Sequence, residues 1–120
     1  VPWSPVARGL LARPKPKDAQ IKSGATLRAS GDGYSEQLYD SPGDWDVVDA
    51  VEKIATARAV SMAEVSLAWL LQRPGVAAPI VGATKMEHLD AALKSLALKL
   101  TPEEISALEA PYRPHGVRGF

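Results

Sequence analysis

The chain has 120 residues, 46% hydrophobic and 23% charged, and its 14 basic and 14 acidic side chains cancel to zero net charge. This balance offers no electrostatic support for a nucleic-acid or membrane partner, and no apolar run approaches the length of a membrane span. The lack of cysteine excludes disulfides and thiolate catalysis, and it fits a reducing, cytoplasmic location. The chain opens without methionine on the apolar character of a strand end, which suggests a missing N-terminal portion, with a processed terminus as the alternative.

Residues 1–9 have the composition of a strand end followed by a turn. Trp3-Ser4-Pro5 leads through Arg8 to Gly9. Parallel α/β folds place their ligands in such loops at the carboxyl ends of strands, and an arginine there can pair with a phosphate. A solvated turn with an ordinary surface arginine is the alternative interpretation.

Residues 13–45 follow no regular pattern, because prolines and glycines interrupt every candidate helix or strand. Lysines and an arginine give the segment a basic start. Long structureless segments in compact domains are commonly functional or disordered. On composition, a functional loop and a mobile surface loop are equally supported.

Residues 46–110 are predicted to be mainly helical. Apolar residues recur at helical spacing in the first part, with Asp44 or Asp46 available as the N-cap. Ser61 and Glu64 have the spacing of a capping box for a second helix, which Arg73-Pro74-Gly75 should end. The apolar positions of these two helices are Val47, Val48, Val51, Ile54 and Ala55, then Val65, Ala68, Trp69 and Leu71.

A short apolar run, residues 76–82, leads into the next predicted helix. Flanked by proline and glycine, it resembles a strand buried on both faces in a parallel sheet. The following Gly82-Ala83-Thr84-Lys85 forms a βα turn, where free helix amides and a lysine suit a phosphate. From the residues alone, a simple helix cap is the favoured interpretation of this turn.

Two further helices are predicted after that turn. Thr84 and Glu87 form a candidate capping box for the first of them. Residues 96–100 alternate weakly, and we interpret them as an irregular approach to the last helix. Thr101-Pro102 with Glu104 makes another box with proline at the first helical position, and Pro111 should stop that helix.

No catalytic residue or metal site is predicted. His88 and His115 are the only histidines, and neither has partners at metal-ligand spacing. No serine lies in a nucleophile-elbow context, and the acidic residues are spread over helix faces and caps.

Three separated motifs resemble the aldo-keto reductase family in order and spacing. Residues 1–9 resemble the end of its strand seven, and residues 79–89 resemble strand eight with the helix that follows. Residues 111–120 look like the tail of a bacterial branch of the family. The resemblance implies an α/β fold, the C-terminal portion of a (β/α)8 barrel, mostly helical with one long loop. Its parts would be the strand-seven end and turn at 1–12, a cofactor-covering loop at 13–45, helices at 46–110 with strand eight near 77–81, and the tail at 111–120.

The resemblance also implies an NADP(H) site. Trp3 would stack near the nicotinamide, and the pyrophosphate side would be lined by Ser4, Val6, Arg8 and Gly9. The adenosine 2′-phosphate end would be held by Gly82, Ala83, Thr84 and Lys85, with His88 where the family usually has glutamine. The chain departs from the family pattern at Thr84, where many members have arginine, and at Ala92, where many have asparagine.

The implied activity is NADPH-dependent reduction of aldehydes or ketones to alcohols. The family's catalytic Asp, Tyr, Lys and His lie in its N-terminal two-thirds, and Tyr34, Tyr39 and Tyr112 do not match that motif. We therefore expect this chain to supply the cofactor-binding end and to be inactive alone. Its partners would be a small carbonyl substrate and the N-terminal barrel portion, or a second copy of itself. Two alternatives are a non-catalytic NADP-binding regulatory protein of the same fold and an independent small helical interaction domain.

Overall fold

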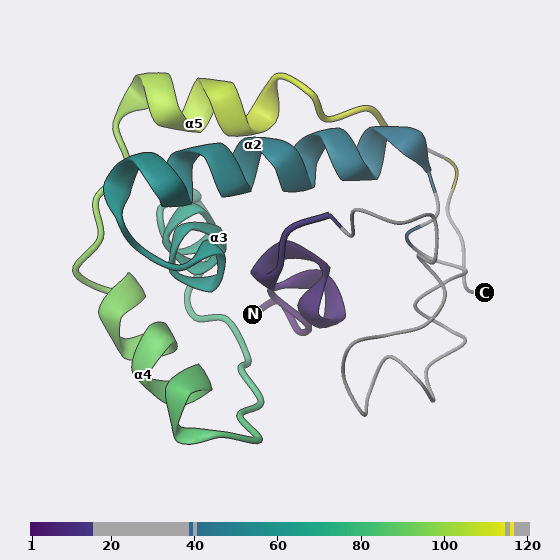
Figure 1. Cartoon of the computed structure of the whole chain (residues 1–120). Coiled ribbons are helices and arrows are strands. Elements are labelled where there is room, and N and C mark those ends of the chain that lie inside the picture. The colour runs from purple at the N-terminus through teal and green to yellow at the C-terminus, as the bar shows by residue number, and fades with distance from the viewer. Residues whose placement is uncertain (16–38, 40, 115, 117–120) are drawn as a thin grey trace.

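The computed structural model describes residues 1–15, 39, 41–114 and 116 (Figure 1). In this part of the chain the elements are η1 (Ala7–Ala12), α2 (Pro42–Arg58), α3 (Met62–Leu71), α4 (Met86–Ser95) and α5 (Pro102–Glu109). Helix α5 lies along α2, whereas α3 contacts α2, α4 and η1. Helices α2 and α3 are therefore the two elements against which the others pack.

Helix α2 begins earlier than predicted. Its N-cap is Ser41, and Pro42 occupies the first turn. Asp44 is the third residue of the helix, where its Oδ2 accepts a 3.1 Å hydrogen bond from the Ser41 amide. The prediction of Asp44 or Asp46 as N-cap was wrong because Asp44 acts as the carboxylate of a capping box. Residues 42–45 thus belong to the helix and not to the predicted loop at 13–45, of which 16–38 and 40 lie outside the described residues.

The predicted N-caps of α3 and α5 are confirmed. Ser61 Oγ accepts a hydrogen bond from the Glu64 amide at 3.1 Å, which is one of the two bonds of the predicted capping box. The capping box at the start of α5 has both of its hydrogen bonds. Thr101 Oγ1 accepts from the Glu104 amide at 3.2 Å, and Glu104 Oε1 accepts from the Thr101 amide at 2.9 Å. Proline stands at the start of α5, as expected.

The predicted capping box of α4 is wrong. The N-cap is Lys85, without a side-chain cap bond, so Thr84 lies one residue before the cap. The third helical residue is then His88 and not Glu87, so neither arm of a Thr84–Glu87 box can form. The Thr84 hydroxyl instead lies 3.5 Å from His88 Nδ1.

The turn between α2 and α3 bends the chain sharply, by 103°. Ala59 closes α2 in the left-handed conformation, with φ of 55°, and its amide donates to the Ala55 and Thr56 carbonyls. Over the described residues no single helix has the length and hydropathy to cross a membrane, although α2 and α3 would pass that test as a bent pair.

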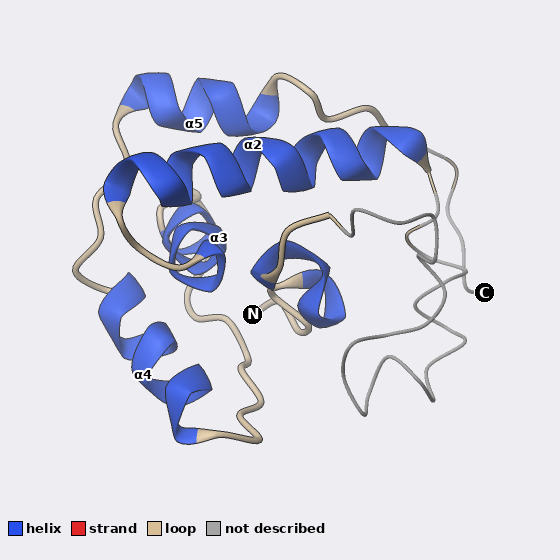
Figure 2. Cartoon of the chain, viewed as in Figure 1, coloured by secondary structure: helices blue, strands red, loops and turns tan. Residues whose placement is uncertain are grey.

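The predicted strand at 76–82 is reduced to a single paired position. Figure 2 draws no strand in the described part of the chain, where one parallel bridge joins Trp3 and Ile80. The expectation of burial on both faces was also wrong, because Ile80 is 56% and Val81 44% exposed. A buried strand needs paired neighbours at both edges and cover on both faces. Among the described residues, only Trp3 pairs with this segment, through Ile80.

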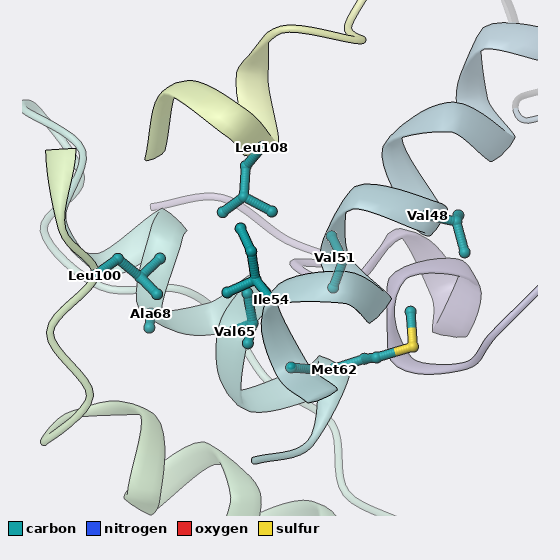
Figure 3. Packing of buried hydrophobic residues seen from close by; sticks show 9 residues of the cluster. Val48, Val51, Ile54, Met62, Val65, Ala68, Leu100 and Leu108 are labelled. Atoms are coloured by element: carbon teal, nitrogen blue, oxygen red, sulfur yellow. The ribbon is translucent and has the colours of Figure 1, made fainter. Parts of the chain in front are cut away.

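The core lies between α2, α3 and α5 (Figure 3). Val48 and Val65 are fully buried, and Leu108 points from α5 toward Ile54 of α2. Of the apolar positions predicted for α2, Val48, Val51, Ile54 and Ala55 are buried, and Val47 is half-buried. Residues 96–100 form no strand, as expected, and Leu100 joins the core.

Helix α4 directs its small residues, not its large ones, to the rest of the molecule. Ser95 is buried and Ala91 and Ala92 are half-buried on the side that packs against α3. The large side chains that we call the α4 stripe are 40% to 70% exposed. They are Met86, Leu89, Leu93 and Leu96, at intervals of three and four residues that align them on one side of the helix.

Candidate functional site

Two loops leave the Trp3–Ile80 bridge in the same direction. The bridge is parallel, and the Ile80 amide donates a 2.8 Å hydrogen bond to the Pro2 carbonyl. Residues that follow Trp3 and residues that follow Ile80 therefore emerge at the same edge. These are the two segments, 4–9 and 82–88, that carry the predicted ligand-binding residues.

The first loop has an unusual concentration of left-handed backbone. Positive φ values occur at Ser4 (50°), Ala7 (50°), Arg8 (56°) and Gly9 (99°). Each non-glycine residue in this region costs about 1–2 kcal/mol. Such conformations persist where the surroundings over-determine them, and they cluster at ligand-binding sites.

Hydrogen bonds and one close approach hold this loop. The Ala7 amide donates to the Ser4 carbonyl at 2.9 Å, and the Gly9 amide donates to the Val6 carbonyl at 3.0 Å. A Cβ at position 9 would lie 3.1 Å from a guanidinium nitrogen of Arg13, whose Nε is 3.4 Å from the Gly9 carbonyl oxygen. Glycine at position 9 thus serves both the positive φ and the approach of Arg13.

The structure gathers the predicted residues of the first loop into one tight turn. Ser4, Val6, Arg8 and Gly9 are half-buried, whereas the Trp3 side chain is 66% exposed. An exposed indole beside a turn offers a flat surface on which an aromatic ring could stack. The arrangement therefore combines a stacking surface, a cationic side chain and a fixed backbone turn.

The second loop is open to solvent. Gly82, Ala83, Thr84, Lys85 and His88 are all exposed. They stand at the start of α4, where unpaired helix amides and the Lys85 ammonium favour an anion. Glu87, in the same first turn, contributes an opposing negative charge. In this loop Lys85 is the formal positive charge, and Glu87 lies close to it in the sequence.

Metal-ligating side chains do not cluster among the described residues. In this part of the chain no three His, Asp or Glu side chains gather as a metal site would require. Tyr112 is 60% exposed, and Tyr34 and His115 lie outside the described residues. Each of the two loops carries one cationic side chain, Arg8 in the first and Lys85 in the second.

Two residues near the first loop were missed by the sequence analysis. Arg13 packs against Gly9, as described above. Ser66, on α3, places its Oγ 3.0 Å from the Leu11 carbonyl oxygen of η1. The only sequence signal for Ser66 is a polar residue between the apolar Val65 and Leu67 of a core helix.

These motifs belong to a known family of oxidoreductases. The aldo/keto reductase family matches residues 1–113, and the chain belongs to that family. It is similar to the versiconal hemiacetal acetate reductase of Aspergillus parasiticus, with 42% identity over 120 residues that cover 98% of this chain and 33% of that protein. It is also similar to an aldo-keto reductase of Alternaria alternata, with 37% identity over 120 residues, 99% of this chain and 30% of that protein.

The chain spans about a third of the length of these relatives. Family membership confirms the predicted resemblance, and it implies the (β/α)8 barrel as the fold to which the helices contribute. Both relatives are fungal, so the predicted bacterial branch stays a prediction.

Proposed function

We propose that this chain supplies the cofactor-binding end of an NADPH-dependent oxidoreductase that reduces aldehydes or ketones to alcohols. The observation that carries the proposal is the parallel bridge between Trp3 and Ile80, from which both loops emerge at one edge. Ligand sites of parallel α/β barrels are built from loops at the carboxyl ends of neighbouring strands. Membership of the aldo/keto reductase family supports the reaction class.

The chemistry of the first loop fits the nicotinamide and pyrophosphate part of such a cofactor. Arg8 carries a positive charge within a turn whose left-handed residues hold the backbone in one shape. In the proposed complex Trp3 stacks beside the nicotinamide, and Ser4, Val6, Arg8 and Gly9 line the pyrophosphate. NADPH supplies the hydride when it is bound, and these residues bind and orient it.

The second loop fits the adenosine 2′-phosphate. Gly82 and Ala83 leave room for close approach, Thr84 and His88 offer polar groups 3.5 Å apart, and Lys85 adds a positive charge. A 2′-phosphate distinguishes NADPH from NADH, so contacts at this helix start would set the preference. Because the loop is exposed to solvent, salt should weaken this discrimination.

We further propose that the chain is the C-terminal third of a cytoplasmic barrel enzyme. The α4 stripe and Trp3, Ile80 and Val81 expose large apolar side chains to solvent. Burying apolar surface contributes about 25 cal/mol per Å², so a neighbouring barrel portion that covered these side chains would stabilise the chain. Alternatively, a second copy of this chain would bury these apolar side chains by self-association.

The chain alone is proposed to bind cofactor without turnover. Residues matching the family's catalytic Asp, Tyr, Lys and His motifs are absent from its sequence. Binding and reduction can therefore be separated by experiment.

The test is titration of the purified chain with NADPH and, separately, with NADH. Quenching of tryptophan fluorescence reports binding. We expect saturable NADPH binding that Lys85→Ala weakens about five- to twentyfold, in line with loss of one charge-assisted contact. Lys94→Ala, at the opposite end of α4, is the matched control and should bind like the wild type. Equal binding of both cofactors, or equal effects of the two lysine variants, would contradict the assigned 2′-phosphate site. Carbonyl reduction by the chain alone would contradict the proposal that this chain binds the cofactor without turnover.

A further inference from the structure

We propose that Ser66 is a positioning residue that holds the turn at residues 6–11 in the shape that receives the cofactor pyrophosphate. The inference rests on the proposed function, because it assigns the role of that turn to cofactor binding. Ser66 lies on α3 and touches no residue predicted to contact the cofactor. It acts through the backbone of η1.

Ser66 is a buried polar group in an apolar setting. Its side chain is 6% exposed, and its helix neighbours Val65 and Leu67 are also buried. A hydroxyl removed from water must find a hydrogen-bond partner. Ser66 Oγ lies 2.9 Å from the Met62 carbonyl oxygen in its own helix and 3.0 Å from the Leu11 carbonyl oxygen of η1. Because a hydroxyl has one proton, the two carbonyls share or compete for it.

The contact with Leu11 reaches the strained part of the turn. The Leu11 amide donates to the Val6 carbonyl at 3.2 Å, so fixing Leu11 also fixes the residue that opens the turn. Between these two residues lie Ala7 and Arg8, both with positive φ. L-residues leave that conformation readily unless the flanking chain is held. The hydrogen bond from the Ser66 hydroxyl to the Leu11 carbonyl therefore helps to hold the Arg8 backbone in its conformation.

The turn has an apolar anchor as well. Leu10 and Leu11 pack against the core cluster of α2 and α3. Apolar packing is non-directional, so it draws the turn onto the core without setting its orientation. The hydrogen bond to the Leu11 carbonyl has a required direction and sets the register of η1 on α3.

A second buried serine provides a matched control. Ser95 is 2% exposed, and its Oγ donates within its own helix to the Ala92 carbonyl at 2.6 Å. Replacing either serine by alanine removes one buried hydroxyl from one helix. The two variants differ in that Ser66 also bonds to η1.

The experiment compares two ligands on the 120-residue chain and its variants. NADPH would contact both loops, whereas adenosine 2′-monophosphate would reach only residues 82–88. We expect Ser66→Ala to weaken NADPH binding roughly two- to tenfold, the range of one hydrogen bond, and to leave adenosine 2′-monophosphate binding unchanged. Ser95→Ala should leave both affinities unchanged. Equal losses for both ligands in Ser66→Ala would show general destabilisation and overturn the positioning role.

Amide hydrogen exchange of the ligand-free chain gives a second readout. Ser66→Ala should speed exchange at the Gly9 and Leu11 amides, both of which donate to Val6, and Ser95→Ala should not. Unchanged exchange at these amides would overturn the inference even if affinity falls. If the wild-type chain fails to bind NADPH but exchange changes as expected, the proposed function fails while the anchoring of η1 by Ser66 stands.

Discussion

The amide of Ile80 donates a 2.8 Å hydrogen bond to the carbonyl of Pro2, and this bond joins segments almost eighty residues apart in the sequence. It holds the beginning of the chain against the segment that leads into α4. The two loops of the candidate site depend on it, because each is anchored at one side of the same bridge. The bridge is isolated, so a change in either segment should affect both loops.

Replacing Ala59 with glycine is expected to stabilise the chain. Ala59 ends α2 with φ of 55°, a conformation that glycine adopts without a steric penalty. We expect a gain of about 0.5–1 kcal/mol in the free energy of unfolding, reduced by the extra freedom of glycine in the unfolded chain. Chemical denaturation of the wild type and of Ala59→Gly measures this change in the free energy of unfolding. Ala57→Gly, an exposed position inside α2, is the control and should lower stability by a similar amount.

Replacing Val65 with alanine should destabilise the fold through its core. Val65, a residue of α3, is fully buried in the core cluster. Removing its methyl groups should cost about 1.5–3 kcal/mol, from lost burial and the cavity that remains. Val81→Ala removes the same groups from a 44% exposed position and should cost much less. Similar losses in the denaturation midpoints of the two variants would mean that the α2–α3–α5 cluster is not the stabilising core.

A negative charge in the α4 stripe should reduce association of the purified chain with itself. Leu93 is 58% exposed on a helix side whose other large residues are also apolar, and such surfaces promote association. Sedimentation velocity should show larger species at high concentration for the wild type and fewer for Leu93→Glu. Lys94→Glu changes the neighbouring exposed residue and should behave like the wild type. If the wild-type chain stays monomeric at all concentrations, the α4 stripe is not buried by self-association.

Much of the local structure could be predicted from the sequence, because helix starts depend on a few neighbouring side chains. Ser61 and Thr101 cap α3 and α5 as expected. The two exceptions were also local. Asp44 is not the N-cap of α2 but the third helical residue, whose carboxylate forms part of the capping box with Ser41. The Thr84 hydroxyl lies near the His88 ring and does not cap α4. Several residues of one turn could each serve as a cap, and the packing of the helix selects among them.

The candidate site was predicted as two sets of residues, but not as one place. The resemblance to the aldo-keto reductase family assigned ligand binding to residues 3–9 and 82–88, whereas from the residues alone a simple helix cap was the favoured interpretation of 82–85. The contact between Trp3 and Ile80, and the bond from Ser66 to Leu11, have no counterpart in local sequence pattern. Both join segments separated by more than fifty residues.

The sequence by itself determined the helices, the N-caps of α3 and α5 and the family to which the chain belongs, since these follow from side chains a few residues apart and from motif order. Only the tertiary structure decided that residues 76–82 stay largely exposed, that the α4 stripe faces solvent, and that the two loops meet at one edge. Burial depends on which other segments lie nearby, and no local pattern contains that information. An apolar run can describe a buried strand, yet it becomes buried only where neighbouring strands and helices cover it.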